Sequence, residues 1–196
     1  RVRIACPEGV NDETIRLYIV SKLSWIKRQQ KMLQGKYRES PRQFLNRESH
    51  YFLGKKYMLK VVEEKGIPQV TLVNKNFITI HITPGASISQ KEKALKEWYR
   101  EELKKRIPQY ITKWEKKIGV QLADWGVKTM RTKWGTCNIN KKRIWLNLEL
   151  AKKPVECLEY IIVHELIHLL ERNHNDRFVA HMNHFLPKWK HYREEL

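Results

Sequence analysis

The sequence lacks any long run of apolar residues. Its longest mainly apolar stretch, residues 161–170, is interrupted by two histidines and a glutamate, and it is well short of the ~18 uninterrupted apolar residues of a membrane-spanning helix. Cysteine is scarce as well, since Cys6, Cys137 and Cys157 form an odd number without paired spacing. We therefore expect no membrane span and no disulfide-stabilised scaffold, and we predict a reduced, cytoplasmic setting.

Acidic residues are few relative to basic ones. The 39 lysines and arginines exceed the 21 aspartates and glutamates, which leaves a net charge of +18. Residues 1–60 carry half of this excess, with fourteen basic and five acidic side chains. Such a charge attracts polyanions and acidic surfaces, so a nucleic-acid partner is one interpretation. We favour the simpler interpretation, in which the basic surface only keeps the protein soluble.

What the chain does have is enough apolar surface to fold. Hydrophobic residues make up 41% of the 196 residues and aromatic residues 10%, which argues against disorder because burial on that scale offsets chain entropy. The length is consistent with one domain or two. Repeats and low-complexity segments are absent from the sequence.

The N-terminal part predicts a helix followed by a small sheet. Asn11-Asp12 offers an N-cap, and apolar residues at helical spacing predict a helix over 12–34. A polar, proline-containing stretch, 35–49, indicates a linker. The short alternating runs after it, bounded by Gly, Pro and Asn, predict an antiparallel β-meander. These runs are residues 51–53, 57–64, 69–73 and 77–83.

The C-terminal part predicts a helix–sheet–helix arrangement. Ser89 and Glu92 form a candidate capping box for a long helix that ends at Gly119, and Pro108 should kink or split it. Two strands follow, joined by a loop that carries Trp134 to Cys137, and then come three helices. The strands are expected over 127–132 and 144–150, and the helices from Pro154 to near Arg172, over 176–185 and after Pro187.

Together these patterns predict an α+β protein with two parts. Residues 1–87 form a basic N-terminal helix plus a β-meander, and residues 88–196 form the domain that carries the chemistry. The oligomeric state is not indicated by any pattern.

The most informative motif is His164-Glu165-Leu166-Ile167-His168. Residues four apart lie on one face of a helix, so both imidazoles can reach one ion. Glu165 points toward water on that ion and can act as a general base in metal-assisted hydrolysis. Apolar neighbours indicate that the helix is buried, where unpartnered imidazoles would be costly.

A catalytic zinc ion takes three protein ligands and keeps one position open. His174 follows His168 by six residues and is the favoured third ligand, with His181 and His184 as alternatives. Metzincins share the His-to-His spacing but have glycine where this chain has Glu171, which argues against that group. Zinc is expected, one ion per chain, although histidine also binds nickel, cobalt or copper.

The chain resembles the YgjP-like metallopeptidase domain family in four segments. They are the run from Arg131 to Cys137 with its Trp-Gly-Thr-Cys motif, residues 144–150, Val163–His168, and Asn173–Phe178. This family is related to SprT-like proteins and other minimal zincins, and its members are described as metal-dependent hydrolases. The resemblance spans roughly residues 90–192.

The resemblance implies a zincin-like catalytic domain. It implies that His164, His168 and His174 bind the metal and that Glu165 is catalytic. Two positions depart from the family pattern: Thr136 stands where serine is usual, and Val179 stands where tryptophan often follows the phenylalanine.

Several further elements have two interpretations. The expected strand 144–150 either pairs with an extended substrate at the cleft edge, as in zincin-like folds, or is an ordinary strand. Cys137 is a transient metal ligand or, as we favour, a buried structural residue. The candidates for stabilising a tetrahedral oxyanion are Arg131, Arg177 and Tyr192.

The leading hypothesis is a zinc-dependent metallopeptidase that hydrolyses a peptide or protein substrate. The alternatives are a nucleic-acid-associated protein with a mainly structural metal, for which Trp25 and Tyr37 lie among basic residues, and a protease recruited to DNA or RNA by its basic N-terminal part. Hydrolysis of a non-peptide amide is a third possibility.

Overall fold

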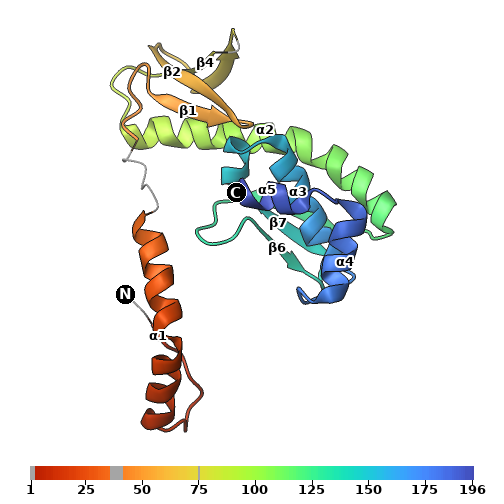
Figure 1. Ribbon diagram of the computed structural model, residues 1–196. Coiled ribbons are helices and arrows are strands. Elements are labelled where there is room, and N and C mark those ends of the chain that lie inside the picture. The colour runs from red at the N-terminus through yellow and green to blue at the C-terminus, as the bar shows by residue number, and fades with distance from the viewer. Residues whose placement is uncertain (1–2, 36–41, 75) are drawn as a thin grey trace. The chain divides into compact units, whose positions relative to one another are not determined.

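The computed structural model describes residues 3–35, 42–74 and 76–196 (Figure 1). The chain divides between Arg42 and Gln43 into two compact units. Helix α1 (Asp12–Gly35) is the regular element of the first unit, in agreement with the predicted helix over 12–34. The predicted division into residues 1–87 and 88–196 stays a prediction.

The second unit begins with a mixed four-stranded sheet. Its strands are β1 (Ser49–Phe52), β2 (Lys55–Glu63), β3 (Gln69–Val73) and β4 (Phe77–Ile82). They are arranged in the order β1-β2-β4-β3, and β2 pairs with β4 in parallel. The predicted antiparallel meander is therefore wrong. Ile78, Thr79 and Ile80 are all buried, and burial on both faces favours a central position for β4 rather than the edge that a meander would give it.

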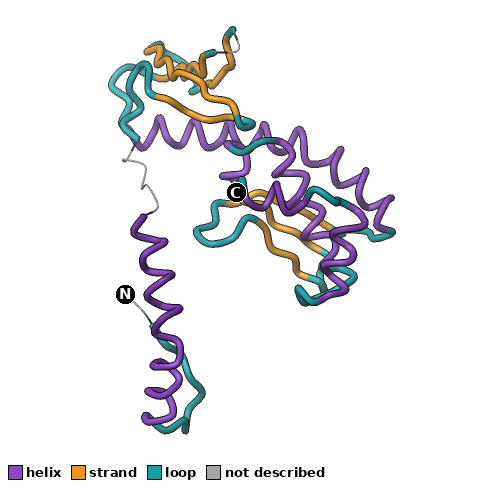
Figure 2. The backbone as a smooth tube through the Cα atoms, in the orientation of Figure 1, coloured by secondary structure: helices purple, strands orange, loops and turns teal. Residues whose placement is uncertain are grey.

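Helix α2 (Ile88–Ile118) connects the two sheets of this unit, since it contacts β3 and β4 of the first sheet and β5 of the second (Figure 2). Its N-cap is Ser87, which forms a capping box with Gln90, so the box predicted at Ser89 and Glu92 was placed two residues too late. Gly119 is the C-cap, as predicted, with φ +77°. The helix passes through Pro108 without being split.

The second sheet has three strands in the order β5-β7-β6. They are β5 (Asp124–Lys128), β6 (Gly135–Asn138) and β7 (Arg143–Asn147). Gly135–Cys137, predicted as part of a loop, instead pair with β7 as a strand. The strand predicted to reach Leu150 ends at Asn147, and the 3₁₀ helix η1 (Leu148–Lys152) follows it.

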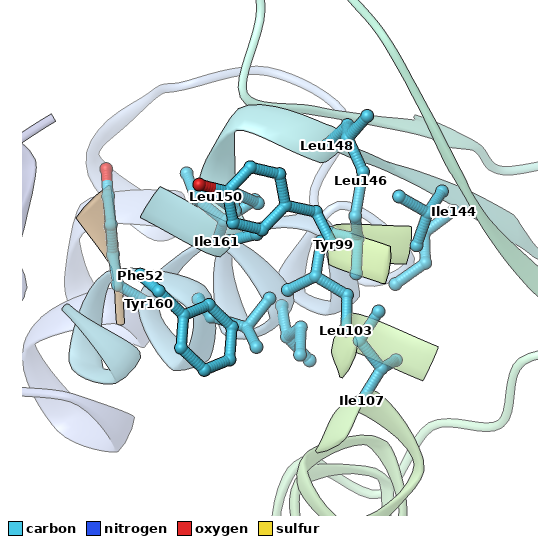
Figure 3. Packing of buried hydrophobic residues seen from close by; sticks show 14 of the residues in the cluster. Phe52, Tyr99, Leu103, Ile107, Ile144, Leu146, Leu148, Leu150, Tyr160 and Ile161 are labelled. Atoms are coloured by element: carbon cyan, nitrogen blue, oxygen red, sulfur yellow. The ribbon is translucent and has the colours of Figure 1, made fainter. Parts of the chain in front are cut away.

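Three helices complete the chain: α3 (Val155–Ile167), α4 (Asp176–Phe185) and α5 (Trp189–Glu194). Helix α3 ends at Ile167, earlier than the predicted end near Arg172, whereas α4 has the predicted bounds. Figure 3 shows α3 packed in the core, where Ile161 lies with side chains from α2, β7 and η1. These include Leu103, Ile107, Ile144, Leu146, Leu148 and Leu150, each at most 1% exposed.

The five α-helices and two small sheets formed by the described residues confirm the predicted α+β class. Among the described residues, no helix combines the length and the hydropathy needed to cross a membrane.

Candidate metal centre and its pocket

The two histidines of the His-Glu-x-x-His motif lie at the C-terminal end of α3. His164 is in the last turn and His168 is the C-cap residue, with ring centroids 4.9 Å apart. The helix before them is almost entirely buried, with Ile161, Ile162 and Val163 at most 5% exposed. The core therefore anchors this part of α3, and the helix presents the two histidines at its C-terminal end.

His174 joins them from the segment between α3 and α4. Its Nε2 lies 3.0 Å from Nε2 of His164, and one nitrogen from each of the three histidines lies within 4.8 Å of the others. Two nitrogens bound tetrahedrally to zinc at ~2.0–2.1 Å are about 3.3 Å apart. The buried Nδ1 of His164 has no hydrogen-bond partner among the described residues. The donor set thus fits a divalent metal ion with an open position.

Phe178 and Asn175 hold His174 in place. The Phe178 ring is 3% exposed, and its centroid lies 4.7–4.9 Å from all three imidazole centroids. Asn175 is the N-cap of α4, and its Oδ1 accepts a hydrogen bond from the Phe178 amide at 3.0 Å. The cap thereby sets where α4 begins and brings the residue before it against the other two histidines.

The protonation states of the histidines suit ligation. Burial, with the neighbouring His168 and His174, lowers the pKa of His164 to about 3, and burial also lowers the pKa of His168. Nδ1 of His168 lies 3.1 Å from the Glu171 carbonyl oxygen. Because a carbonyl only accepts, Nδ1 carries the proton and leaves the Nε2 lone pair available to a metal.

Glu165 is buried beside the cluster, with 4% of its surface exposed. Burial raises the pKa of its carboxyl to about 8, against a smaller lowering by Lys133. The side chain packs against Gly135 of β6, where a Cβ would lie 2.5 Å from Glu165 Oε1. A side chain larger than the hydrogen atom of glycine would therefore clash with the Glu165 carboxylate at position 135.

The three histidines and Glu165 line one pocket of about 660 Å³. Arg131, Arg177 and Tyr192, the predicted candidates for oxyanion stabilisation, are not among its lining residues. Besides the histidines and Cys137, the lining residues whose side chains can donate a hydrogen bond are Lys133, Trp134, Thr136, Tyr160, Arg172 and Arg193. The sequence contained a signal for Tyr160, which precedes His164 by one helical turn. Arg193 is on α5, and no local pattern connects it with the motif.

The alternative third ligands do not reach the cluster. His181 and His184 are on α4, where they lie against Phe185. Cys137 lines the pocket but is not part of the group of three. Burial, and the nearby Glu165, raise its pKa to about 11, as expected of a structural thiol.

Of the two interpretations of residues 144–150, the structure favours the ordinary strand, because β7 has a neighbour on each side and no free edge. The edge strands of this sheet are β5 and β6. Gly135, Thr136 and Cys137 of β6 line the pocket.

Asn147, at the end of β7, organises the loop that leads into β6. Its amide group donates to the carbonyl oxygens of Met130 and Lys133 at 2.9 and 2.8 Å, and its Oδ1 accepts from the Met130 and Glu149 amides, both at 3.2 Å. This residue was not predicted from the sequence. An asparagine at the end of an apolar strand is the signal that could have found it.

Comparison with known proteins adds a family to this geometry. A family model described as "YgjP-like, metallopeptidase domain" matches residues 1–196. A search of curated proteins found no match. Among solved structures, the chain is similar to the metallopeptidase zymogen of Pyrococcus abyssi abylysin, with 17% sequence identity and a TM-score of 0.42. The similarity covers 45% of this chain and 89% of that one.

Proposed function

The chain belongs to the YgjP-like metallopeptidase domain family, and on that premise we propose that it is a zinc-dependent peptidase. In this proposal His164, His168 and His174 bind one zinc ion and Glu165 is the general base. The observation that carries the proposal is the convergence of three imidazole nitrogens within 4.8 Å of one another, in the same pocket as a buried carboxylate.

A bound zinc ion would supply a Lewis acid that polarises the substrate carbonyl and acidifies water. Glu165 accepts a proton from the water that attacks the carbonyl carbon. It then delivers this proton to the amine nitrogen as the C–N bond breaks.

We assign stabilisation of the oxyanion, first expected of Arg131, Arg177 or Tyr192, to two other side chains. Tyr160 and Arg193 line the pocket with the histidines. Tyr160 can donate a hydrogen bond to the developing oxyanion, and Arg193 adds positive charge. An extended substrate would pair with the free edge of β6 through its main chain.

The proposal is tested by elemental analysis and peptide hydrolysis with three variants. His174→Ala should lose most of its zinc and all activity. Glu165→Gln should keep its zinc and lose hydrolysis, because an amide cannot accept the proton. His184→Ala is the control, since this residue is on α4 outside the cluster, and it should retain both zinc and activity.

Full zinc content in His174→Ala would remove this residue from the ligand set. Hydrolysis that survives Glu165→Gln would show that another group is the base. If the wild-type protein contains nickel or cobalt instead of zinc, the proposed metal is wrong but the proposed ligands are unaffected.

Recruitment to nucleic acid is a second candidate, and α1 supplies the observation that favours it. Tyr18 and Trp25 are 64% and 60% exposed on this helix, and Lys22 Nζ lies 5.6 Å from the Tyr18 ring centroid. Exposed aromatic rings beside basic side chains can stack on bases. Tyr37 lies outside the described residues. Binding of a single-stranded oligonucleotide that falls steeply with salt, and that weakens in Trp25→Ala, would support recruitment.

A further inference from the structure

A second cavity adjoins the pocket at the metal centre. This cavity has a volume of about 710 Å³ and extends along β6 to Asn138 and Trp145. The two cavities share Thr136, Cys137 and Ile139, together with His168 and Arg172. They therefore lie side by side along β6, and we call the two together the β6 groove.

Most of the charged side chains that line this groove are basic. Lys133, Arg172 and Arg193 line its first part, and Lys141, Arg143 and Arg172 line the second. Glu165 is the one acidic residue among the lining residues of both cavities, and the proposed reaction uses it.

Most of these charges have no acidic partner. Among the described residues, Lys133, Lys141, Arg172 and Arg193 are within ion-pair distance of no acidic side chain, and Arg143 alone pairs, with Asp124 at 2.6 Å. The groove therefore presents four basic side chains whose charge is not offset by an ion pair.

We propose that the β6 groove selects peptide substrates with acidic residues on the segments that flank the scissile bond. The inference rests on the proposed function, because it assumes that the substrate chain passes the histidine cluster. Arg172 is the central determinant, since it lines both cavities, and Lys141 extends the positive charge away from the cluster. Fixed positive charges on the groove wall attract carboxylates and repel basic side chains, which gives selectivity as well as faster association.

A peptide fits this surface better than a nucleic acid does. The charges lie around the proposed catalytic centre and along a free strand edge, where backbone pairing holds an extended polypeptide. Side chains of a paired strand alternate in direction, so acidic residues on one face would point toward the groove wall.

The test uses three peptides of equal length that differ only at the positions flanking the central bond, with glutamate, glutamine or lysine there. An exposed charge pair changes an equilibrium constant by a factor of about 1.4 to 5, so several pairs should favour the glutamate peptide over the glutamine peptide by about tenfold in kcat/KM. Arg172→Glu combined with Lys141→Glu should abolish or reverse this preference. Lys65→Glu is the control, because this exposed residue lies in the turn between β2 and β3 and lines neither cavity.

A binding measurement separates failure of this inference from failure of the proposed function. The affinity of the zinc-loaded Glu165→Gln protein for each labelled peptide is measured by fluorescence anisotropy at 50 and 500 mM salt. Preferential binding of the glutamate peptide that requires Arg172 and weakens with salt supports the inference, even if the wild-type protein hydrolyses no peptide. Hydrolysis of all three peptides at equal rates overturns it and leaves the proposed function intact. A single-stranded oligonucleotide is also tested as a competitor of the labelled glutamate peptide. If it displaces the labelled peptide at a lower concentration than unlabelled glutamate peptide does, and if this displacement also requires Arg172, the inference is overturned in favour of a nucleic-acid groove.

Discussion

The side chain of Glu165 rests directly on the backbone of Gly135. A Cβ at Gly135 would lie 2.5 Å from Oε1 and 2.8 Å from Cγ of Glu165, and 2.8 Å from Cγ2 of Ile161. Neither neighbour can move freely, because Glu165 and Ile161 are 4% and 5% exposed on a helix packed in the core. The glycine on the edge strand therefore determines where the proposed base can be.

Gly135→Ala should displace the Glu165 carboxylate without disturbing the histidines. A misplacement of about 1 Å can lower a rate by about 10²-fold, so we expect a loss of that order in kcat with normal zinc content. Gly126→Ala is the matched control. It inserts a Cβ into the same sheet, but against the Trp145 ring, and should cost stability more than activity. Equal activity losses in the two variants would show that Gly135 has no special relation to the base.

The stability of the metal-free protein should depend on pH through Glu165. Burial raises the pKa of this carboxyl from 4.5 to about 8, so between these pH values the folded state binds more protons than the unfolded state. Stability contributed by the protonated group is complete below pH ~4.5 and is lost as pH rises toward 8. Glu165→Gln removes the titration and should be more stable than wild type at pH 8, by about 4 kcal/mol at most.

Urea denaturation of both metal-free proteins at pH 5, 7 and 8.5 measures this difference. The difference in the free energy of unfolding should grow across the series. A constant difference would show that Glu165 titrates equally in the folded and unfolded states.

Removal of the Asn147 side chain should loosen the loop before β6. Its four hydrogen bonds to backbone groups are made by a residue that is 4% exposed. Buried groups left without partners cost about 1–3 kcal/mol, so Asn147→Ala should lose several kcal/mol of unfolding free energy. Asn138→Ala, which removes one exposed bond to the Lys141 amide, should lose less than about 1 kcal/mol. Thermal unfolding of the two variants compares them, and similar melting temperatures would contradict the role of Asn147.

Cysteine reactivity should distinguish the three thiols of the metal-free protein. Cys6 is exposed, whereas burial raises the pKa of both Cys137 and Cys157 to about 11. Because the thiolate is the reactive form, a thiol reagent at pH 8 should modify Cys6 rapidly and the other two only after denaturation. Rapid modification of more than one thiol per chain in the native protein would show that β6 or α3 opens readily.

Much of the local structure could be predicted from the sequence. The bounds of α1 and α4 agree with the apolar periodicity, and Gly119 ends α2 as its position indicated. The spacing of His164 and His168 placed both on one helix face, and His174 lies beside them, as a six-residue span between two helices allows. These features depend on residues that are close together in the chain.

The errors in sheet topology concern pairings between distant segments. Alternation in residues 77–83 indicated a strand but not its neighbours, so the central position of β4 and its parallel partner β2 were missed. The Trp-Gly-Thr-Cys motif was assigned to a loop because four residues carry little strand signal, whereas pairing with β7 makes Gly135–Cys137 the edge strand of the pocket.

The chemical groups of the candidate site could thus be predicted from the amino-acid order: two histidines and a glutamate on one helix, a third histidine nearby, and a basic chain. What surrounds these groups depends on how the chain folds. Folding brought Gly135 beneath Glu165, Arg193 of α5 into the pocket, and unpaired basic residues along the β6 groove. Spacing along a helix follows from its fixed 3.6-residue period. Contacts between distant segments are set by how the whole core packs, and no local sequence pattern predicts these contacts.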